Sequence, residues 1–251
     1  MTINLKSKER LDDLGINDFH IIQNPDLFCF GIDAVLLSDF AKVKEGQTVL
    51  DLCTGTGILP ILLAAKTKAG KLKGIEIQEE SVDMAKRSVL YNQIEDRVEI
   101  IHGDVKEADK LFSQDSFDVI TCNPPYMLCD HGFKNPEEAK AIARHEVLLS
   151  FDDVARVTSK LLKNAGEFYL VHRPFRLVEL LDTLTKYHLE PKDIRFVHSY
   201  ADKEPSMVLI HCKKGAKRYV KIEKPLIIYE KENVYTQEVL EIYHLSPNFC
   251  L

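Results

Sequence analysis

The tetrapeptide Asn123-Pro124-Pro125-Tyr126 directly follows an apolar run that ends at Cys122. Two adjacent prolines donate no backbone N–H and fix φ, so a buried strand must end there in a stiff, extended turn. Such a turn presents the Asn123 amide and two proline carbonyls beside the Tyr126 ring. Acceptors next to an aromatic face suit a planar group that carries an NH₂, such as an adenine or a carboxamide. An ordinary strand exit, with Asn123 as a turn former and Tyr126 as packing, explains the tetrapeptide equally well.

A second candidate site lies upstream, where Asp51 is followed by a turn that contains Gly55 and Gly57. The two glycines allow backbone to approach a ligand closely at the carboxyl edge of a parallel sheet. In the dinucleotide fingerprint Gly-x-Gly-x-x-Gly the third position is glycine, but here it is Pro60. Asp51 would also repel a pyrophosphate and attract an ammonium. S-adenosylmethionine carries an ammonium and a sulfonium without phosphate, so it is the favoured cofactor.

Further acids follow the next strands. Glu76 comes about 20 residues after the glycines, where a carboxylate can accept both ribose hydroxyls. Asp104 closes another strand and could accept from an adenine amine, while Asp33 begins a helix and could lie beside the cofactor. Each of these acids alone is more often a helix cap or a solvated strand end. Acids at three successive strand ends, together with the glycine turn, favour a nucleoside with a positively charged tail.

Alternating apolar runs predict the elements that position these residues. Short strands and helices follow one another from Thr48, which is the signature of a doubly wound parallel sheet. We expect strands near 48–52, 72–77, 98–103, 117–122, 166–172, 194–198 and 207–213. We expect helices near 34–41, 57–67, 78–92, 105–112, 151–163 and 175–187. Upstream, residues 1–18 read as a loose arm, and the runs 19–23 and 27–30 as a hairpin split by the turn signal 24–26.

Composition limits the function classes. The formal charge is −6 and the pI is about 5.9, which argues against a protein that coats nucleic acid non-specifically. The N-terminal stretch lacks an apolar signal-peptide core, and no run approaches the roughly 20 apolar residues of a membrane span, so we expect a cytoplasmic protein. Six cysteines occur without a Cys-x-x-Cys pair, so we expect reduced thiols and no zinc site.

These motifs, in their order along the chain, resemble the class I S-adenosylmethionine-dependent methyltransferases that methylate amines. The lead-in 28–37 and the tail 227–243 look like the family of bacterial tRNA adenine-N6 methyltransferases that modify an adenosine of a valine tRNA next to its anticodon loop. The resemblance covers nearly the whole chain. It implies an α/β fold with a doubly wound, seven-stranded, mostly parallel sheet. It also implies an N-terminal arm and hairpin over 1–30, a methyltransferase domain over 31–214 and a C-terminal extension over 215–251 that packs on that domain.

The resemblance also assigns site residues. It implies that Asn123, Pro124 and Tyr126 handle the target amine, that no metal takes part, and that tRNA is the substrate. The implied cofactor residues are Asp33, Asp51, Cys53, Thr54, Gly55, Gly57, Glu76, Ile77, Asp104, Val105 and Asn123. Another RNA, a glutamine of a protein, or a non-catalytic module that binds the cofactor are the alternatives. Glutamine methyltransferases usually carry a sizeable helical domain before the cofactor fold, and the stretch before Thr48 is short.

Basic residues are the candidates for contacts with RNA. They are Arg144 and His145 after the proline turn, Arg173 and Arg176 after the fifth strand, and the cluster Lys213, Lys214, Lys217 and Arg218. A solvated surface is the alternative reading of each group.

Overall fold

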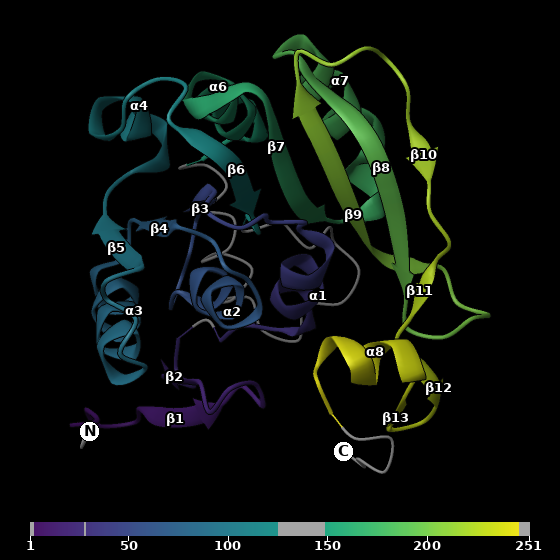
Figure 1. Ribbon diagram of the computed structural model, residues 1–251. Helices are drawn as coiled ribbons and strands as arrows, with labels where there is room; N and C mark the ends of the chain where they lie inside the picture. The colour runs from purple at the N-terminus through teal and green to yellow at the C-terminus, as the bar shows by residue number, and fades with distance from the viewer. Residues whose placement is uncertain (1–2, 28, 125–148, 246–251) are drawn as a thin grey trace.

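A nine-stranded sheet forms the centre of the computed structural model, which describes residues 3–27, 29–124 and 149–245 (Figure 1). The strands lie in the order β10-β8-β9-β7-β6-β3-β4-β5, where β10 is Lys221–Ile222, and β11 (Leu226–Ile227) also pairs with β8. Seven of them are the predicted strands: β3 (Thr48–Leu52), β4 (Lys71–Glu76), β5 (Val98–His102), β6 (Phe117–Cys122), β7 (Leu162–His172), β8 (Leu189–His198) and β9 (Pro205–Lys214). The doubly wound fold class is therefore confirmed.

The strand directions place the candidate site. Strands β5, β4, β3, β6 and β7 run parallel, and β9 is antiparallel to both of its neighbours. The chain moves outward from β3 to β5 and then returns to the other side of β3 with β6. Ligands bind at the carboxyl ends of the strands beside such a reversal. This edge carries the residues that follow β3, β4 and β6.

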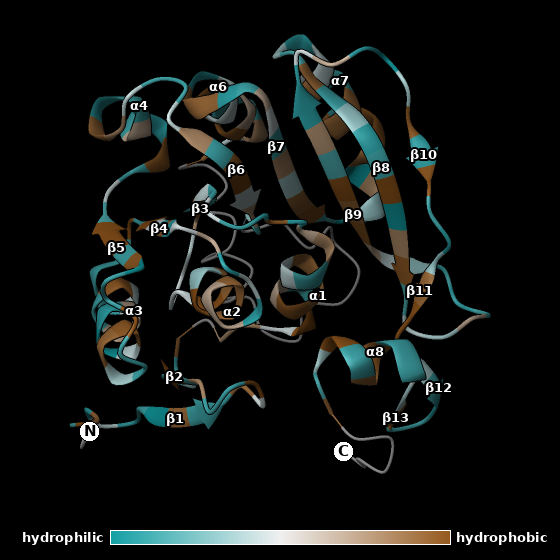
Figure 2. Ribbon diagram, viewed as in Figure 1, coloured by the Kyte–Doolittle hydropathy of each residue, from teal (hydrophilic) through white to brown (hydrophobic). Residues whose placement is uncertain are grey.

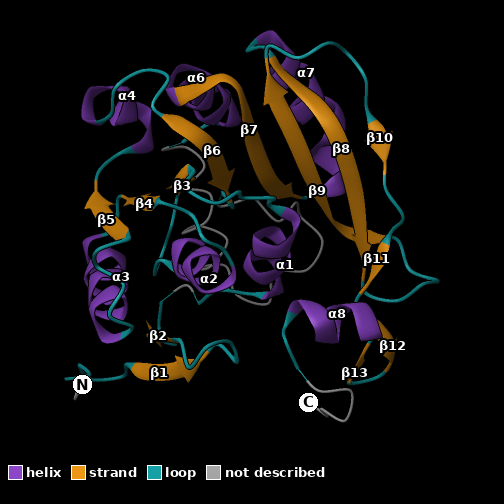
Figure 3. Cartoon of the chain, viewed as in Figure 1, coloured by secondary structure: helices purple, strands orange, loops and turns teal. Residues whose placement is uncertain are grey.

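Helices cover both faces of the sheet (Figure 3). One apolar cluster joins a face of the sheet to α1 (Ile32–Phe40), α2 (Ile58–Lys66) and α3 (Glu79–Tyr91). The other cluster joins the opposite face to α6 (Phe151–Leu161) and α7 (Leu177–Lys186). Val49 belongs to the first cluster and its neighbour Leu50 to the second, as alternation along a strand requires. The apolar stripes that meet the sheet are brown in Figure 2.

The predicted helix over 105–112 is two short elements, the 3₁₀ turn η1 (Val105–Glu107) and the α-helix α4 (Ala108–Leu111). A second 3₁₀ turn, η2 (Pro174–Arg176), precedes α7. The four described cysteines are free thiols, and burial raises the pKa of Cys122 and Cys212 well above the usual value. No helix within the described ranges is long and apolar enough to cross a membrane.

The N-terminal hairpin differs from the prediction. It pairs β1 (Arg10–Asp13) with β2 (His20–Gln23), whereas Leu27, Cys29 and Phe30 are in no strand and Phe28 lies outside the described residues. The polar stretch that was predicted to be a loose arm thus supplies a strand. The side chain of Asn92, at the end of α3, accepts from the His20 N–H and donates to its carbonyl at 2.8 and 2.7 Å. These bonds hold β2 against α3.

The C-terminal extension continues the sheet and then returns to α1. Its strands β10 (Lys221–Ile222) and β11 (Leu226–Ile227) pair in parallel with β8, which raises the strand count from the predicted seven to nine. The hairpin of β12 (Tyr229–Lys231) and β13 (Val234–Tyr235) and the helix α8 (Gln237–Ile242) follow, and α8 contacts α1. The rings of Tyr229, Tyr235 and Tyr243 stack with centroids 5.3 and 5.6 Å apart.

Candidate active site

The turn after β3 has the backbone that its glycines predict. Gly55 and Gly57 have φ of +55° and +84°, and Cys53 also has a positive φ, of +60°. The Thr54 N–H donates to the Ile75 carbonyl at 3.0 Å, which ties the turn to β4. A Cβ at Gly57 would lie 3.1 Å from the Cβ of Ala85, whereas a Cβ at Gly55 would meet no atom within 4 Å. Gly57 therefore permits close helix packing, and Gly55 faces open space.

Asp51 lies beneath this turn as a buried carboxyl group. It is 1% exposed, and its Oδ1 accepts from the Thr121 hydroxyl at 2.6 Å. No described donor bonds its buried Oδ2, and the Thr54 hydroxyl is likewise without a hydrogen-bond partner among the described residues. Burial raises the pKa of Asp51 to about 7, although the nearby hydroxyls of Thr121 and Thr54 oppose the shift, and the charge of Glu76 adds to it. A cation that came close would favour ionisation of this carboxyl.

Glu76 holds the glycine turn from the neighbouring strand. Its carboxylate accepts from the backbone N–H groups of Gly55, Ile77 and Gln78 at 2.9, 3.0 and 2.9 Å. The side chain of Ile77 stays 45% exposed at the same edge, although it is apolar. A carboxylate has about four acceptor positions, so these bonds leave one for another donor.

Asp104 follows β5 and caps η1. Its Oδ1 accepts from the Lys106 N–H at 2.9 Å, and its Oδ2 lies 3.6 Å from the Lys106 ammonium. Val105 is buried in the core at 5% exposure. The capping contact is the alternative that the sequence offered for Asp104, and it still leaves the residue at the predicted edge.

Asn123 and Asp33 meet at the end of β6. The Asn123 Nδ2 donates to the Asp33 Oδ2 at 3.0 Å, and the Asp33 Oδ1 accepts from the Ala34 N–H at 2.9 Å. Because a carboxylate can only accept, this bond determines which end of the Asn123 amide faces Asp33. The amide oxygen of Asn123 therefore points away from Asp33 and can accept a hydrogen bond from another donor. Pro124, next along the chain, is buried.

Several predicted residues lie outside the described ranges: Pro125, Tyr126, Arg144 and His145. Two residues at the site were not predicted. Thr121 bonds Asp51 from β6, which only the strand register could reveal. Gly74 lies inside β4, where a Cβ would come within 2.7–2.9 Å of three Thr54 side-chain atoms. A glycine inside a buried strand signals such a close approach, so the sequence did carry a sign of it.

We expect Gly74→Ala to weaken cofactor binding about tenfold and to lower the melting temperature, because the added methyl pushes Thr54 and the glycine turn away from β4. Thermal unfolding and calorimetric titration measure the two effects. The double variant Gly74→Ala/Thr54→Ala removes two of the three close contacts, those with Oγ1 and Cγ2 of Thr54, and should regain part of the lost stability. A double variant as unstable as Gly74→Ala would show that the two side chains do not compete for this space.

The predicted basic residues occupy different positions. Arg173 and Arg176 lie at the carboxyl end of β7 with His172, where Arg173 donates to the Ser206 carbonyl at 3.0 Å and Arg176 contacts Glu179. Burial lowers the pKa of His172 to about 4, so it is neutral at pH 7. Lys213 pairs with Glu167 of β7 in the strand register, toward the amino end and away from the candidate site.

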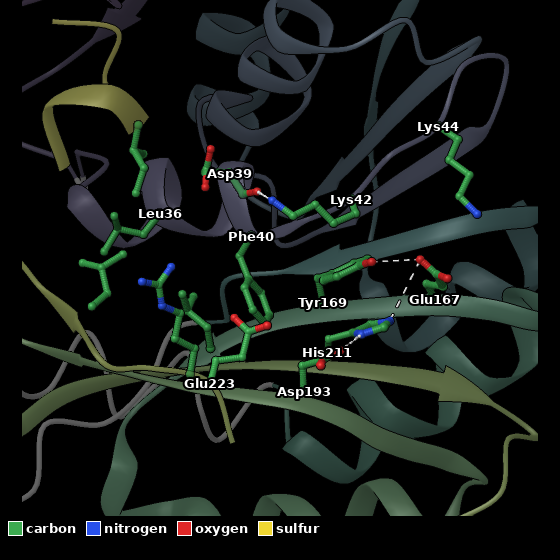
Figure 4. A pocket seen from close by; sticks show the side chains of 14 residues that line it. Leu36, Asp39, Phe40, Lys42, Lys44, Glu167, Tyr169, Asp193, His211 and Glu223 are labelled. Carbon is green, nitrogen blue, oxygen red and sulfur yellow. Dashed lines mark hydrogen bonds and ion pairs between the residues drawn. The ribbon is translucent and has the colours of Figure 1, made fainter. Parts of the chain in front are cut away.

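A separate pocket of about 280 Å³ lies between α1 and the strands β7, β9 and β8 (Figure 4). Its polar groups contact one another: His211 Nδ1 lies 2.7 Å from Asp193, and the Tyr169 hydroxyl donates to Glu167 at 2.8 Å. Tyr169 and His211 also stack with ring centroids 4.5 Å apart. The described residues that line the pocket include none of the predicted site residues. The lining residues are Leu36, Asp39, Phe40, Lys42, Lys44, Glu167, Tyr169, Asp193, Arg195, Leu209, His211, Glu223, Leu226 and Ile242.

The fold defines a class. A doubly wound sheet in which β9 runs antiparallel to its two neighbours, with acids and a glycine turn at the carboxyl edge of the parallel strands, is the class I, Rossmann-like methyltransferase fold. A solved structure described as a predicted O-methyltransferase from Agrobacterium tumefaciens has this fold. It superimposes with a TM-score of 0.69 at 21% identity and covers 84% of this chain and 95% of that one.

Sequence comparison identifies the family. The family model described as methyltransferase small domain matches residues 19–189, so the chain belongs to this family. A relative from Phocaeicola vulgatus, 29% identical over 84% of this chain and 87% of its own length, is named tRNA1(Val) (adenine(37)-N6)-methyltransferase. A relative from Aeromonas hydrophila with the same name is 25% identical over 89% of this chain and 92% of its own length.

Proposed function

We propose that the protein transfers a methyl group from S-adenosylmethionine to N6 of an adenine in tRNA. The names of the relatives support the substrate and the reaction. The observation that carries the proposal is the Asp33–Asn123 contact at the end of β6, because it leaves an amide oxygen for a substrate amine. We also propose that residues 31–214 form the methyltransferase domain, between an N-terminal arm and a C-terminal extension. We propose that the protein is located in the cytoplasm.

The residues around the glycine turn fit the cofactor. The open space at Gly55 leaves room for a ligand against the backbone, and the unsatisfied buried Oδ2 of Asp51 favours a positive group nearby. Glu76 keeps one acceptor position for a ribose hydroxyl, and Asp104 lies at the next strand end. Cys53, Thr54, Ile77 and Val105 follow the same strand ends, although Val105 is buried in the core. When bound, S-adenosylmethionine supplies a methyl group on a sulfonium, which becomes a neutral thioether as the methyl leaves.

The chain's own part in the reaction is to orient the amine. An exocyclic adenine nitrogen is a poor nucleophile, because its lone pair is delocalised into the ring. Two acceptors, the Asn123 Oδ1 and the Pro124 carbonyl, draw its N–H bonds toward a tetrahedral geometry and direct the lone pair at the methyl carbon. The new N–C bond would form as the C–S bond of the bound cofactor breaks, and the nitrogen would then lose one proton to solvent. Alignment and fixed dipoles therefore account for the rate, and Tyr126 is proposed to stack on the base.

The test supplies the protein with labelled S-adenosylmethionine and, in parallel, total tRNA, total rRNA and release factors. We expect label only in tRNA, and nucleoside analysis should identify N6-methyladenosine. Label in a glutamine of a release factor, with none in any RNA, would replace this proposal with the glutamine methyltransferase alternative. No transfer to any of these substrates, despite cofactor binding, would favour a non-catalytic module.

A further inference from the structure

Residues 217–224 follow the outermost edge of the sheet, where Figure 1 shows β10. The segment has four basic residues, Lys217, Arg218, Lys221 and Lys224, against the single acid Glu223. Every residue from 217 to 222 is exposed. The whole chain carries a net charge of −6, so this segment is positive in a protein that is negative overall.

The two lysines that precede this segment differ from it, because both form ion pairs. The Lys214 ammonium lies 2.8 Å from Asp115, and that of Lys213 lies 3.9 Å from Glu167. Within the described ranges, no carboxylate lies within 4.0 Å of a side-chain nitrogen of Lys217, Arg218 or Lys224. The charges of these three residues are thus available to an external anion.

An exposed aromatic ring lies among these charges. Tyr219 is 72% exposed, and the Lys192 ammonium lies 5.5 Å from its ring centroid. The same ammonium donates to the Lys217 carbonyl at 3.1 Å, so Lys192 links the ring to the basic segment. Proteins that bind unpaired nucleotides combine such positive grooves with rings on which bases stack.

The strand register places Ile222, the last residue of β10, level with the candidate active site, whereas residues 217–220 precede β10 and lie toward the amino ends of the parallel strands. Cys122, which precedes Asn123, is aligned across the sheet with Leu170, Ile210, Ile194 and Ile222 in turn. Four strand spacings separate Cys122 from Ile222, which is about 19 Å. A folded RNA hairpin is large enough to bridge this distance while one of its bases lies at Asn123.

Two simpler accounts explain the edge less well. Lysines on an edge strand prevent aggregation, but β10 has only two residues, and two apolar side chains, Val220 before it and Ile222 within it, are 46% and 59% exposed. Pairing with a second copy of the chain would oppose like charges from the two basic segments, which is unfavourable.

We propose that residues 217–224, together with Lys192, bind the phosphate backbone of the substrate RNA, with an unpaired base stacked on Tyr219. The inference rests on the proposed RNA substrate and extends it to a second contact region. Phosphate contacts position an RNA without reading its sequence, so this edge would contribute to affinity and register and leave the choice of base to the site at Asn123.

The test compares two double variants that each remove two positive charges. Lys217→Ala/Arg218→Ala should reduce the slope of log affinity for tRNA against log salt by about 1.5, because each lost phosphate contact is worth about 0.7–0.9. Lys213→Ala/Lys214→Ala is the matched control and should keep the wild-type slope. Tyr219→Ala should weaken binding by roughly 5- to 150-fold, while Tyr219→Phe keeps the stacking face and the affinity. Melting temperatures show that each variant is folded.

The outcomes separate this inference from the proposed function. If the wild-type protein methylates tRNA but Lys217→Ala/Arg218→Ala binds tRNA with the wild-type salt slope, as the control variant does, the edge does not contact phosphate and the inference is wrong. A dimer that dissociates in Lys217→Ala/Arg218→Ala without any change in RNA affinity would also overturn it. If the wild-type protein methylates only a protein glutamine, the proposed function itself fails.

Discussion

Asn123→Ala is expected to lower kcat by roughly 10²–10³, since loss of one oriented hydrogen-bond partner in a preorganised site typically has that effect. The affinity for S-adenosylmethionine should stay close to the wild-type value, because the Asn123 amide oxygen addresses the target amine. Single-turnover methylation of tRNA and calorimetric titration of the cofactor measure these two quantities. A smaller change in kcat is expected for Asp33→Asn, which allows the Asn123 amide to turn over but keeps its oxygen.

The matched control is Asn164→Ala, at an exposed position in β7. It removes the same amide and should leave kcat and cofactor affinity unchanged. Full activity of Asn123→Ala would eliminate the proposed role of its amide oxygen.

The second large effect is expected for Asp51→Asn, which removes the charge but keeps an acceptor for the Thr121 hydroxyl. Cofactor affinity should fall by about 30-fold or more, because loss of one member of a buried charge pair costs about 2–5 kcal/mol. The unliganded variant should nevertheless be more stable than the wild-type protein at pH 8, since it no longer buries an unsatisfied carboxylate. Calorimetry measures the change in cofactor affinity, and denaturant unfolding measures the change in stability. Unchanged affinity would mean that Asp51 does not face the cofactor's ammonium.

The pH dependence of Asp51 follows from its raised pKa. The carboxyl titrates near 7 in the folded protein and at 3.8 as its ordinary value, so between these limits the folded state binds more protons. Its contribution to stability is complete below about pH 4 and is lost as the pH rises through 7. A cation beside it lowers the pKa again, so cofactor binding at pH 6.5 should release a proton. Titrations in buffers of different ionisation enthalpy detect this proton, and Asp51→Asn should not release it.

The sequence predicted the parts of the fold that repeat a local pattern. β3 and β6 have the predicted bounds, because their apolar runs end at a glycine turn and at two prolines. The N-terminal hairpin was predicted wrongly, since apolar content favoured 27–30 as the partner of β2. The actual partner, Arg10–Asp13, is polar, and the chain reaches it through Asn17 and Asp18, which both have positive φ.

At the site, spacing predicted which residues follow the strand ends but not how they are paired. The Asp33–Asn123 contact joins positions 90 residues apart, and the Thr121–Asp51 bond joins positions 70 apart. Such contacts depend on sheet register and on the direction of α1, which no local pattern contains. The sequence likewise could not predict that Lys214 is ion-paired while Lys217, among the described residues, is not, because Asp115, the partner of Lys214, is distant along the chain and comes close only in the folded protein.

The stacked tyrosines of the C-terminal extension give the protein an optical signal of its own. The chain has no tryptophan and nine tyrosines, so tyrosine dominates its near-ultraviolet absorption. Burial raises the pKa of the Tyr243 phenol, and the nearby charge of Asp33 adds a smaller part of the shift. The Tyr243 ring is nearly parallel to that of Tyr235. Parallel rings at this spacing couple their transitions, and the coupling changes with small rotations. Near-ultraviolet circular dichroism can therefore follow movement beside Asp33 without any label.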